Sequence, residues 1–184
     1  GIQQDISRAY ASISANAENQ VGVFGAKEIR SLFTLTRSSE ENCARDAAIS
    51  LGNLAVVAKN QTLVVALGAL GPLVDLLSSP FPSCRCFSAR ALSRLAAHAD
   101  NQTKIVEAGA LAGLVTLCMD TDDEVRRYAA MALCNVSSHR ANGNAVVAVG
   151  GIPPLIAMLE GRSDPCRRFA AMTLCNLSTH GVNQ

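Results

Sequence analysis

Hydrophobic and polar positions over residues 120–138 follow the period of an amphipathic α-helix. Acidic residues open the stretch, where the positive end of a helix dipole favours negative charge. Apolar residues then recur at three- and four-residue spacing and share one helical face: Val125, Ala129, Ala132, Leu133 and Val136. A second stripe with the same spacing, Tyr128, Met131 and Asn135, points elsewhere. The first stripe predicts a packed core, and the second one predicts contact with a partner.

The same pattern returns at positions that differ by 41 residues. The dipeptide Asn-Gln marks this period, with Asn142-Gly143 in its place once: Asn19-Gln20, Asn60-Gln61, Asn101-Gln102 and Asn183-Gln184. Apolar residues keep the same columns, as in the set Leu51, Leu92, Leu133 and Leu174. A fixed period without insertions predicts stacked supersecondary units in place of a closed globule.

The period divides the chain into tandem units of one domain over residues 1–184. The complete units are expected at residues 19–59, 60–100, 101–141 and 142–182. Residues 1–18 match only the end of a unit, and residues 183–184 begin a further one. Because repeat arrays carry polar capping units at their ends, we expect the chain to be an excerpt of a longer array.

Each unit is expected to contain three helices. In the second unit, Asn60 would cap a short helix that ends at Gly68, and Pro72 would lie in the first turn of the next helix. A third helix follows from about Ser83 to His98. The glycine returns as Gly109 and Gly150, whereas the first unit has Lys27 there, so we expect a different turn in that unit.

This unit resembles the armadillo repeat over nearly the whole chain. The resemblance rests on Asn101-Gln-Thr-Lys-Ile-Val-Glu-Ala-Gly-Ala-Leu and on Ala129-Ala-Met-Ala-Leu-Cys-Asn-Val. It implies an all-α fold, a right-handed α-α superhelix whose third helices line a concave groove. It also implies a non-enzymatic scaffold or adaptor that binds an extended peptide or a partner helix in that groove.

The groove residues follow from the second stripe of each third helix. The stripe of the first unit contains Asp46, Ile49 and Asn53. In the later units it contains Phe87, Arg90 and Arg94; Tyr128, Met131 and Asn135; and Phe169, Met172 and Asn176. Asn53, Asn135 and Asn176 match the groove asparagines of the family, whose amides offer the donor and acceptor that a peptide unit needs. The alternatives are that the asparagines cap neighbouring turns and that the aromatic side chains fill gaps between helices.

Departures from the family pattern bear on the ligand. Importin-α places Trp four residues before the groove Asn, and this chain has no Trp, which disfavours recognition of a basic localisation signal. Arg94 replaces one groove Asn and Arg90 precedes it by one turn, a pair suited to a carboxylate or phosphate. We therefore expect a partly apolar protein or peptide ligand with an acidic residue near this pair. A nuclear-import adaptor and a ubiquitin-ligase substrate-recognition module that use the same groove remain the alternatives.

Composition and charge argue against nucleic-acid binding and against a membrane-spanning segment. The net charge of +1 gives no excess of basic residues for a nucleic-acid backbone. No apolar run reaches the roughly 18–20 residues of a membrane span, so we expect no transmembrane segment. Tethering of a full-length protein to a membrane is left open.

Cysteines and histidines recur in the same columns, which predicts structural roles, with no metal and no cofactor. Most of the seven cysteines stand where other units have small or apolar residues, and an odd number suits a reducing compartment. We therefore expect a cytoplasmic protein, with a nuclear location left open. His98, His139 and His180 are expected to bond the last carbonyls of the third helices. A rival hypothesis is an enzyme with Cys86 as nucleophile, which would require a depressed thiol pKa.

Overall fold

The computed structural model describes residues 1–22 and 24–179, which form thirteen α-helices and no strand. The helices that end each unit are α1 (Ile2–Ala15), α4 (Glu41–Leu54), α7 (Pro82–Leu95), α10 (Asp123–Ser137) and α13 (Asp164–Thr179). The short first helices of the units are α2 (Ala17–Gly22), α5 (Ala58–Ala66), α8 (Ala99–Glu107) and α11 (Arg140–Ala148). The second helices are α3 (Ala26–Thr36), α6 (Leu70–Leu76), α9 (Ala110–Leu117) and α12 (Ile152–Leu159).

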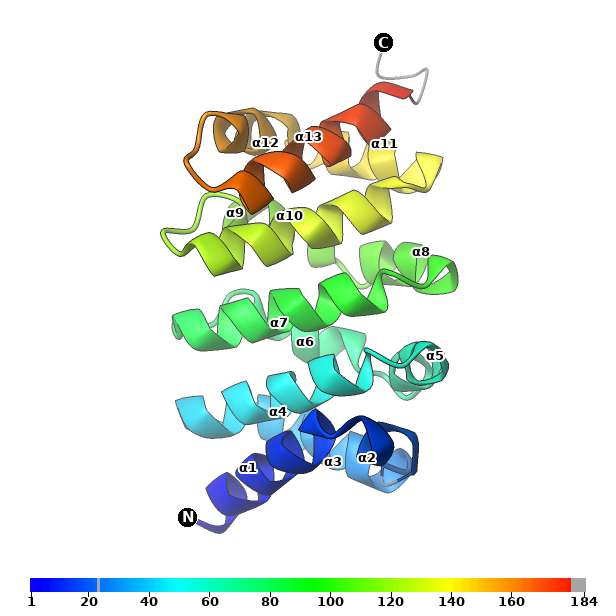
Figure 1. Ribbon diagram of the computed structural model, residues 1–184, viewed down its shortest axis with the longest axis vertical. Coiled ribbons are helices and arrows are strands. Elements are labelled where there is room, and N and C mark those ends of the chain that lie inside the picture. Colours follow the sequence, from blue (N-terminus) through cyan, green and yellow to red (C-terminus); the bar gives the residue numbers. More distant parts are fainter. Residues whose placement is uncertain (23, 180–184) are drawn as a thin grey trace.

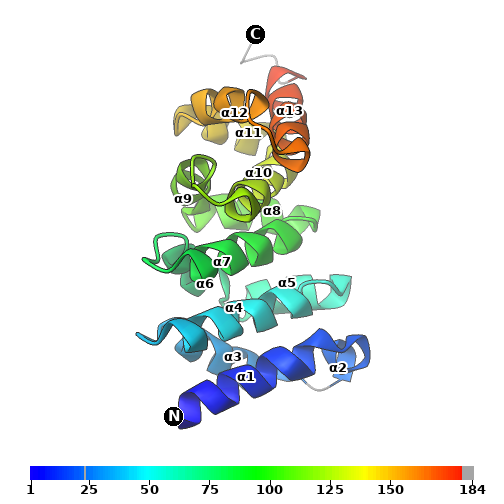
Figure 2. The same ribbon diagram turned by 60° about the vertical axis from the view of Figure 1, so that its left-hand side comes forward.

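The units stack in chain order along one axis. Figure 1 shows the third helices one above the other, from α1 at the bottom to α13 at the top. Figure 2 shows the second helices α9 and α12 beside the third helices α10 and α13. Each third helix packs on the third helices before and after it, from α1 on α4 to α10 on α13. The expected three helices per unit are confirmed, and the bounds of the units stay a prediction.

The core runs without interruption from one unit to the next. The leucine columns that mark the period are buried, with Leu174 of the last unit only partly so: Leu51, Leu92 and Leu133, and Leu32, Leu73, Leu114 and Leu155 on the second helices. They belong to one cluster that extends from Ile29 to Leu177. A unit therefore buries its apolar face only by stacking on its neighbours, as repeat architectures do.

The predicted turn glycines have backbone conformations that favour glycine. The φ angles of Gly68, Gly109 and Gly150 are 103°, 82° and 78°, in the left-handed region where a Cβ is disfavoured. The first unit differs, as expected from Lys27. There Gly25 precedes α3, and its backbone N–H donates to a carboxylate oxygen of Glu28 at 3.0 Å.

The predicted N-cap role of Asn60 is wrong. Helix α5 begins at Ala58, directly after Val57, so Asn60 lies inside the helix. Its Nδ2 donates to the Gln20 carbonyl at 2.5 Å, and Asn101 Nδ2 donates to the Gln61 carbonyl at 3.2 Å. These two asparagines therefore join α5 to α2 and α8 to α5, whereas the Nδ2 of Asn142 in α11 has no partner among the described residues.

The glutamines of the Asn-Gln dipeptides satisfy backbone carbonyls at the ends of the third helices. Their Nε2 atoms donate to the carbonyls of Ser14, Ala55 and Ala96 at 2.8, 2.8 and 3.2 Å, respectively. These carbonyls lie where a helix has no intrahelical donors left. Equivalent buried hydrogen bonds from these glutamines therefore recur at intervals of 41 residues.

The predicted role of the histidines is also corrected. His98 immediately precedes α8, and its Nδ1 accepts a hydrogen bond from the Asp100 backbone N–H at 3.3 Å. It therefore caps the start of a first helix and does not bond the end of α7, because α7 ends at Leu95. His139 holds the same place before α11 but its ring makes no capping bond. His180 lies outside the described residues.

Five of the seven cysteines are buried, and all seven are free thiols. Cys175 is exposed although Gly52, Ser93 and Cys134 of its column are buried, because nothing described packs on that side of α13. Among the described residues, no single helix is long and apolar enough to cross a membrane. The pair α11 and α12 passes that test by length and composition when taken together, and is bent by 89°.

Candidate binding face of the third helices

The third helices form one face of the stack, the side turned toward the viewer in Figure 1. We call it the third-helix face. It consists of the predicted site residues Asn53, Phe87, Arg90, Arg94, Tyr128, Met131, Asn135, Phe169, Met172 and Asn176, with Asp46 and Ile49 of the first unit. The stacking of α4, α7, α10 and α13 brings these residues into neighbouring positions of successive units.

Asn135 and Asn176 are each fixed by the preceding third helix. Asn135 Nδ2 donates to the Ser93 carbonyl at 2.9 Å, and Asn176 Nδ2 donates to the Cys134 carbonyl at 3.1 Å. Neither Oδ1 atom accepts a hydrogen bond from a described residue, and neither is a buried unpaired atom. Both asparagines are only partly buried. Each one thus presents a carbonyl oxygen that an incoming donor can reach.

Asn53 has a different environment. Its Nδ2 donates to Ser14 Oγ at 3.2 Å, and its Oδ1 accepts from Arg90 Nη2 at 2.9 Å and from Arg94 Nη1 at 3.4 Å. Donor and acceptor are therefore both engaged within the chain. The sequence places Asn53 in the same column as Asn135 and Asn176, but its amide binds two arginines of the next unit.

Arg90 and Arg94 lie one turn apart on α7 and approach α4 together. Arg94 Nη1 also donates to the Gly52 carbonyl at 2.7 Å. Burial and the charge of Arg90 lower the pKa of Arg94, with a small opposing effect from Tyr128. No carboxylate of a described residue lies within 4.0 Å of either guanidinium group, although other arginines have such partners. The pair is a local concentration of positive charge.

Each aromatic residue of the face lies under an arginine. The guanidinium carbon of Arg90 is 5.2 Å from the Phe87 ring centroid. Arg127 stacks on Tyr128 at 4.3 Å, and Arg168 stacks on Phe169 at 5.0 Å. These distances suit cation–π attraction. The rings also pack against the buried clusters, so they fill gaps between helices as well.

The sequence analysis did not include Arg127 and Arg168 in the face. Arg127 does pair with Glu124 at 2.7 Å, but it also covers Tyr128. The signal was present in the columns, since Arg127 and Arg168 each precede the aromatic residue directly. In the second unit Cys86 stands in that column, and Arg90 reaches the ring from one turn later.

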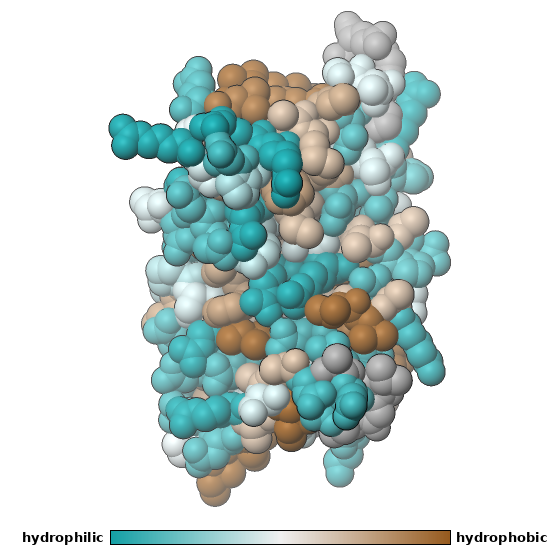
Figure 3. Space-filling model, in the orientation of Figure 1, coloured by the Kyte–Doolittle hydropathy of each residue, from teal (hydrophilic) through white to brown (hydrophobic). Residues whose placement is uncertain are grey.

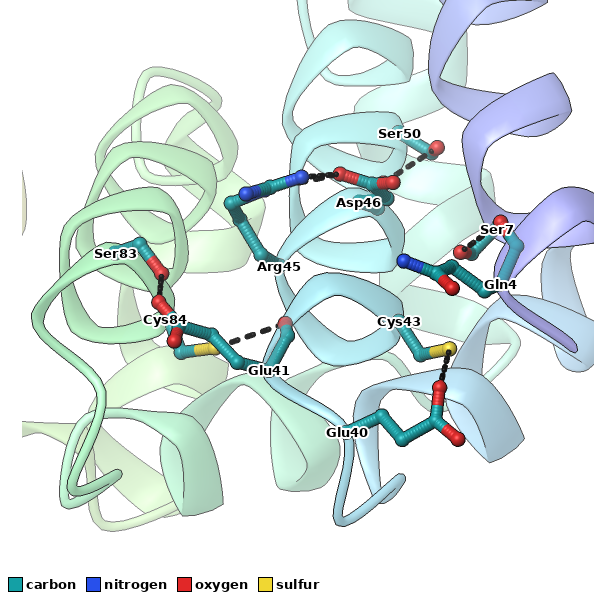
Figure 4. Close-up of polar contacts among 10 residues, drawn as sticks. All are labelled: Gln4, Ser7, Glu40, Glu41, Cys43, Arg45, Asp46, Ser50, Ser83 and Cys84. Carbon is teal, nitrogen blue, oxygen red and sulfur yellow. Dashed lines mark hydrogen bonds and ion pairs between the residues drawn. The ribbon is translucent and has the colours of Figure 1, made fainter. Parts of the chain in front are cut away.

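The first unit offers no aromatic ring at this position. Asp46 stands there, is 5% exposed, and accepts hydrogen bonds from its neighbour Arg45 at 3.0 and 2.8 Å. Figure 4 shows this pair on α4, and it also shows Ser83 Oγ of α7 bonded to a Glu41 carboxylate oxygen. The face therefore has no aromatic ring from α4 and gains aromatic groups from α7 onward.

Met131 and Met172 provide the apolar part of the face. Met131 is partly buried, whereas Met172 is 48% exposed. Figure 3 shows this side of the molecule with polar side chains gathered across the middle of the stack and apolar patches next to them. A ligand on this face would meet charge near the second unit and apolar surface near the fourth.

The best-defined hollows lie away from this face, where second helices turn into third helices. One is lined by Cys118, Met158 and Cys166, and another by Leu77, Gly113 and Met119. Between them, Arg85 of α7 and Asp120 form an ion pair at 2.9 Å. No group of three or more potential ligands among the described residues is arranged to hold a metal ion. Burial raises the pKa of Cys86 to about 11, with added effects from Asp122 and Glu124, which is opposite to what a nucleophilic thiol requires.

The comparisons with known proteins agree with this architecture. The family model described as Armadillo/beta-catenin-like repeat matches residues 58–97 and 98–138. The chain has the fold of an armadillo solenoid. The predicted fold class, an all-α superhelix of armadillo type, is therefore confirmed, and so is the resemblance to the family.

Engineered proteins are among the solved structures similar to this armadillo solenoid. Two engineered proteins from the Northeast Structural Genomics Consortium are 29% and 28% identical to it, with TM-scores of 0.88 and 0.90. The alignments cover 95% and 97% of this chain, and 72% and 75% of those chains. A designed armadillo repeat protein in complex with the peptide (KR)4 is 25% identical, with a TM-score of 0.86 over 94% of this chain and 74% of that chain. No curated protein matches the sequence.

Proposed function

We propose that this armadillo solenoid is an interaction scaffold or adaptor that holds an extended segment of a partner protein along the third-helix face. The observation that supports this most is the state of Asn135 and Asn176. Their Nδ2 atoms are fixed by carbonyls of the preceding helix, and their Oδ1 atoms accept nothing from the described residues. Two acceptors in register suit the backbone N–H groups of an extended chain.

The internal hydrogen bonds change the expected mode of recognition. Because each Nδ2 is already used, each asparagine offers the ligand an acceptor only. The bond to the preceding helix also holds the side chain in one orientation before the ligand arrives, which lowers the entropy cost of binding. The ligand carbonyls must find other donors, and the guanidinium groups of Arg127 and Arg168 lie on the same helices as the two asparagines.

The charge of the face supports a ligand with an acidic residue. A designed armadillo protein of similar fold binds the basic peptide (KR)4, but Arg90 and Arg94 would repel such a peptide here. The absence of Trp and the presence of this pair also weigh against the nuclear-import alternative. A role in substrate recognition for a ubiquitin ligase uses the same face and is compatible with it. We retain the cytoplasm as the proposed location, with the nucleus left open.

The test compares peptide binding by the wild type and by the double variant Asn135→Ala/Asn176→Ala. A peptide is first selected for binding from a displayed random library, and its Kd is measured by fluorescence anisotropy. Each lost hydrogen bond is worth about 1 kcal/mol, so the double variant should bind roughly tenfold or more weakly.

Asn42→Ala is the matched control, because Asn42 is an exposed asparagine of α4 outside the third-helix face. Circular dichroism melts verify that all variants are folded at the temperature of the measurement. An unchanged Kd for the double variant would contradict the proposal, as would an equal loss of affinity in the control.

A further inference from the structure

Two guanidinium groups share one neutral acceptor at the junction of α4 and α7. Arg90 Nη2 and Arg94 Nη1 both donate to Asn53 Oδ1, at 2.9 and 3.4 Å. Asn53 is held in turn by Ser14 Oγ of α1, and Arg94 is held by the Gly52 carbonyl. The chain therefore fixes two cations close together with hydrogen bonds and without an anion.

Most other arginines of the third helices have an anionic partner, which both members of this pair lack. Five of those arginines have a carboxylate partner in the described part of the chain: Arg45, Arg85, Arg126, Arg127 and Arg167. Arg90 and Arg94 have none, although like charges at this helical spacing repel each other.

Arg90 and Arg94 each also have a guanidinium nitrogen that is available to a ligand. Arg90 Nη1 and Arg94 Nη2 donate to no described residue, and neither is a buried atom. Arg90 is further held over the Phe87 ring, which limits its freedom to move into solvent. The two free nitrogen atoms are therefore available to an acceptor on a ligand.

We propose that Arg90 and Arg94 bind a phosphoryl group on the partner segment, and that Asn53 acts as the positioning residue for both. This inference rests on the proposed function and names the chemistry that one part of the ligand would carry. A carboxylate would neutralise only one of the two charges. A phosphoserine or phosphothreonine carries a charge of about −1.5 to −2 and three acceptor oxygens, and arginine forks pair with such oxygens in bidentate fashion.

The binding test uses the 184-residue chain and two small probes. N-acetyl-O-phosphoserine amide and N-acetylglutamic acid amide are each titrated into ¹⁵N-labelled protein, and the arginine Nε–H signals are followed by NMR. The phosphorylated probe should bind with a Kd at least tenfold lower than that of the glutamate probe. Arg90→Gln and Arg94→Gln, made separately, should each remove that difference.

Arg30→Gln is the control for charge. Arg30 is an exposed arginine of α3, lies outside the third-helix face and has no carboxylate partner among the described residues. Its loss should leave both Kd values unchanged. Equal binding of the two probes, or an equal effect of Arg30→Gln, would overturn the proposal.

Asn53→Asp tests the positioning role with two readouts of opposite sign. The new carboxylate keeps the shape of the side chain and supplies the anion that the pair lacks. Binding of the phosphorylated probe should fall at least tenfold, while the Tm should rise. Asn135→Asp, where no arginine pair donates to the side chain, should give no rise in Tm. An Asn53→Asp variant that binds the probe as the wild type does would overturn the assignment.

The result separates this inference from the proposed function. If both small probes bind equally while a library-selected peptide still depends on Asn135 and Asn176, the phosphoryl site is wrong and the scaffold proposal stands. If peptide binding does not depend on those asparagines, the scaffold proposal fails on its own test.

Discussion

Side-chain amides illustrate what one residue type can do in a repeat. Asn60 and Asn101 lie inside first helices and bond carbonyls of the preceding unit. Asn135 and Asn176 also bond a preceding helix, yet keep an acceptor for a ligand. The donor and the acceptor of the Asn53 amide are both engaged, by Ser14 and by the arginine pair, respectively. The position of an asparagine within the repeat predicts its role only in part, because it does not reveal which carbonyl or arginine the side chain will contact.

The ion pair between Arg85 and Asp120 gives a prediction at the scale of single residues. The two side chains are 20% and 7% exposed, respectively. Burial alone would raise the pKa of Asp120, but hydrogen bonds from the Asp122 backbone and from Arg85 outweigh it and lower the pKa. Asp120→Asn should therefore reduce the free energy of unfolding at pH 7 by about 1–3 kcal/mol.

The sign of the pH dependence follows from the lowered pKa. The stabilisation by Asp120 is present above its unfolded-state pKa of about 3.9, and it is lost as the pH falls through the lower pKa of the folded state. Urea unfolding at several pH values should show the wild type and Asp120→Asn converging below about pH 4. Asp75→Asn serves as control, since Asp75 is exposed and forms no ion pair with a described residue. A constant difference down to pH 2 would refute the assignment.

At the scale of elements, the turns between first and second helices depend on glycine. Gly109 has a φ of 82° and no neighbouring atom that a Cβ would meet, so Gly109→Ala tests backbone conformation alone. The cost should be about 1–2 kcal/mol. Gly52→Ala is the opposite case, because Gly52 lies inside α4 and a Cβ there would make only ordinary contacts with Ala91, the nearest at 3.5 Å. That change should stabilise the protein by about 0.5–1 kcal/mol, and thermal melts measure both. Equal effects of the two substitutions would contradict this account of the turn.

Most elements could be predicted from the sequence, and their ends could not. The period and the leucine columns predict three helices per unit and their order of packing, because burial follows apolar spacing. The start of α5 was misplaced because Asn60 is a good N-cap residue by type, yet its amide is needed by the Gln20 carbonyl of the preceding unit. His98 was expected at the end of a third helix, but it lies just before α8. The two positions are close in sequence, because the connection between α7 and α8 is only three residues long.

At the scale of the whole molecule, stacking places residues that are 41 positions apart in the sequence next to one another on a surface. The residues of the third-helix face could be named in advance, because a fixed period places equivalent side chains side by side. The arginine–aromatic pairs and the shared acceptor at Asn53 could not, since they depend on which rotamer each side chain takes between two helices. Ile156 shows the other consequence of stacking. It is 49% exposed, whereas Val115 of the same column is 8% exposed beneath the next unit.

The central claim is that a partner segment lies along the third helices, and the most direct test is to locate a bound peptide. A library-selected peptide with a nitroxide spin label is added to ¹⁵N-labelled protein, and the broadening of each backbone amide signal is measured. The proposal predicts the strongest broadening in α7, α10 and α13, centred near Asn135 and Asn176. Broadening centred on the exposed side of α12, or on the hollow beside Met119, would contradict it.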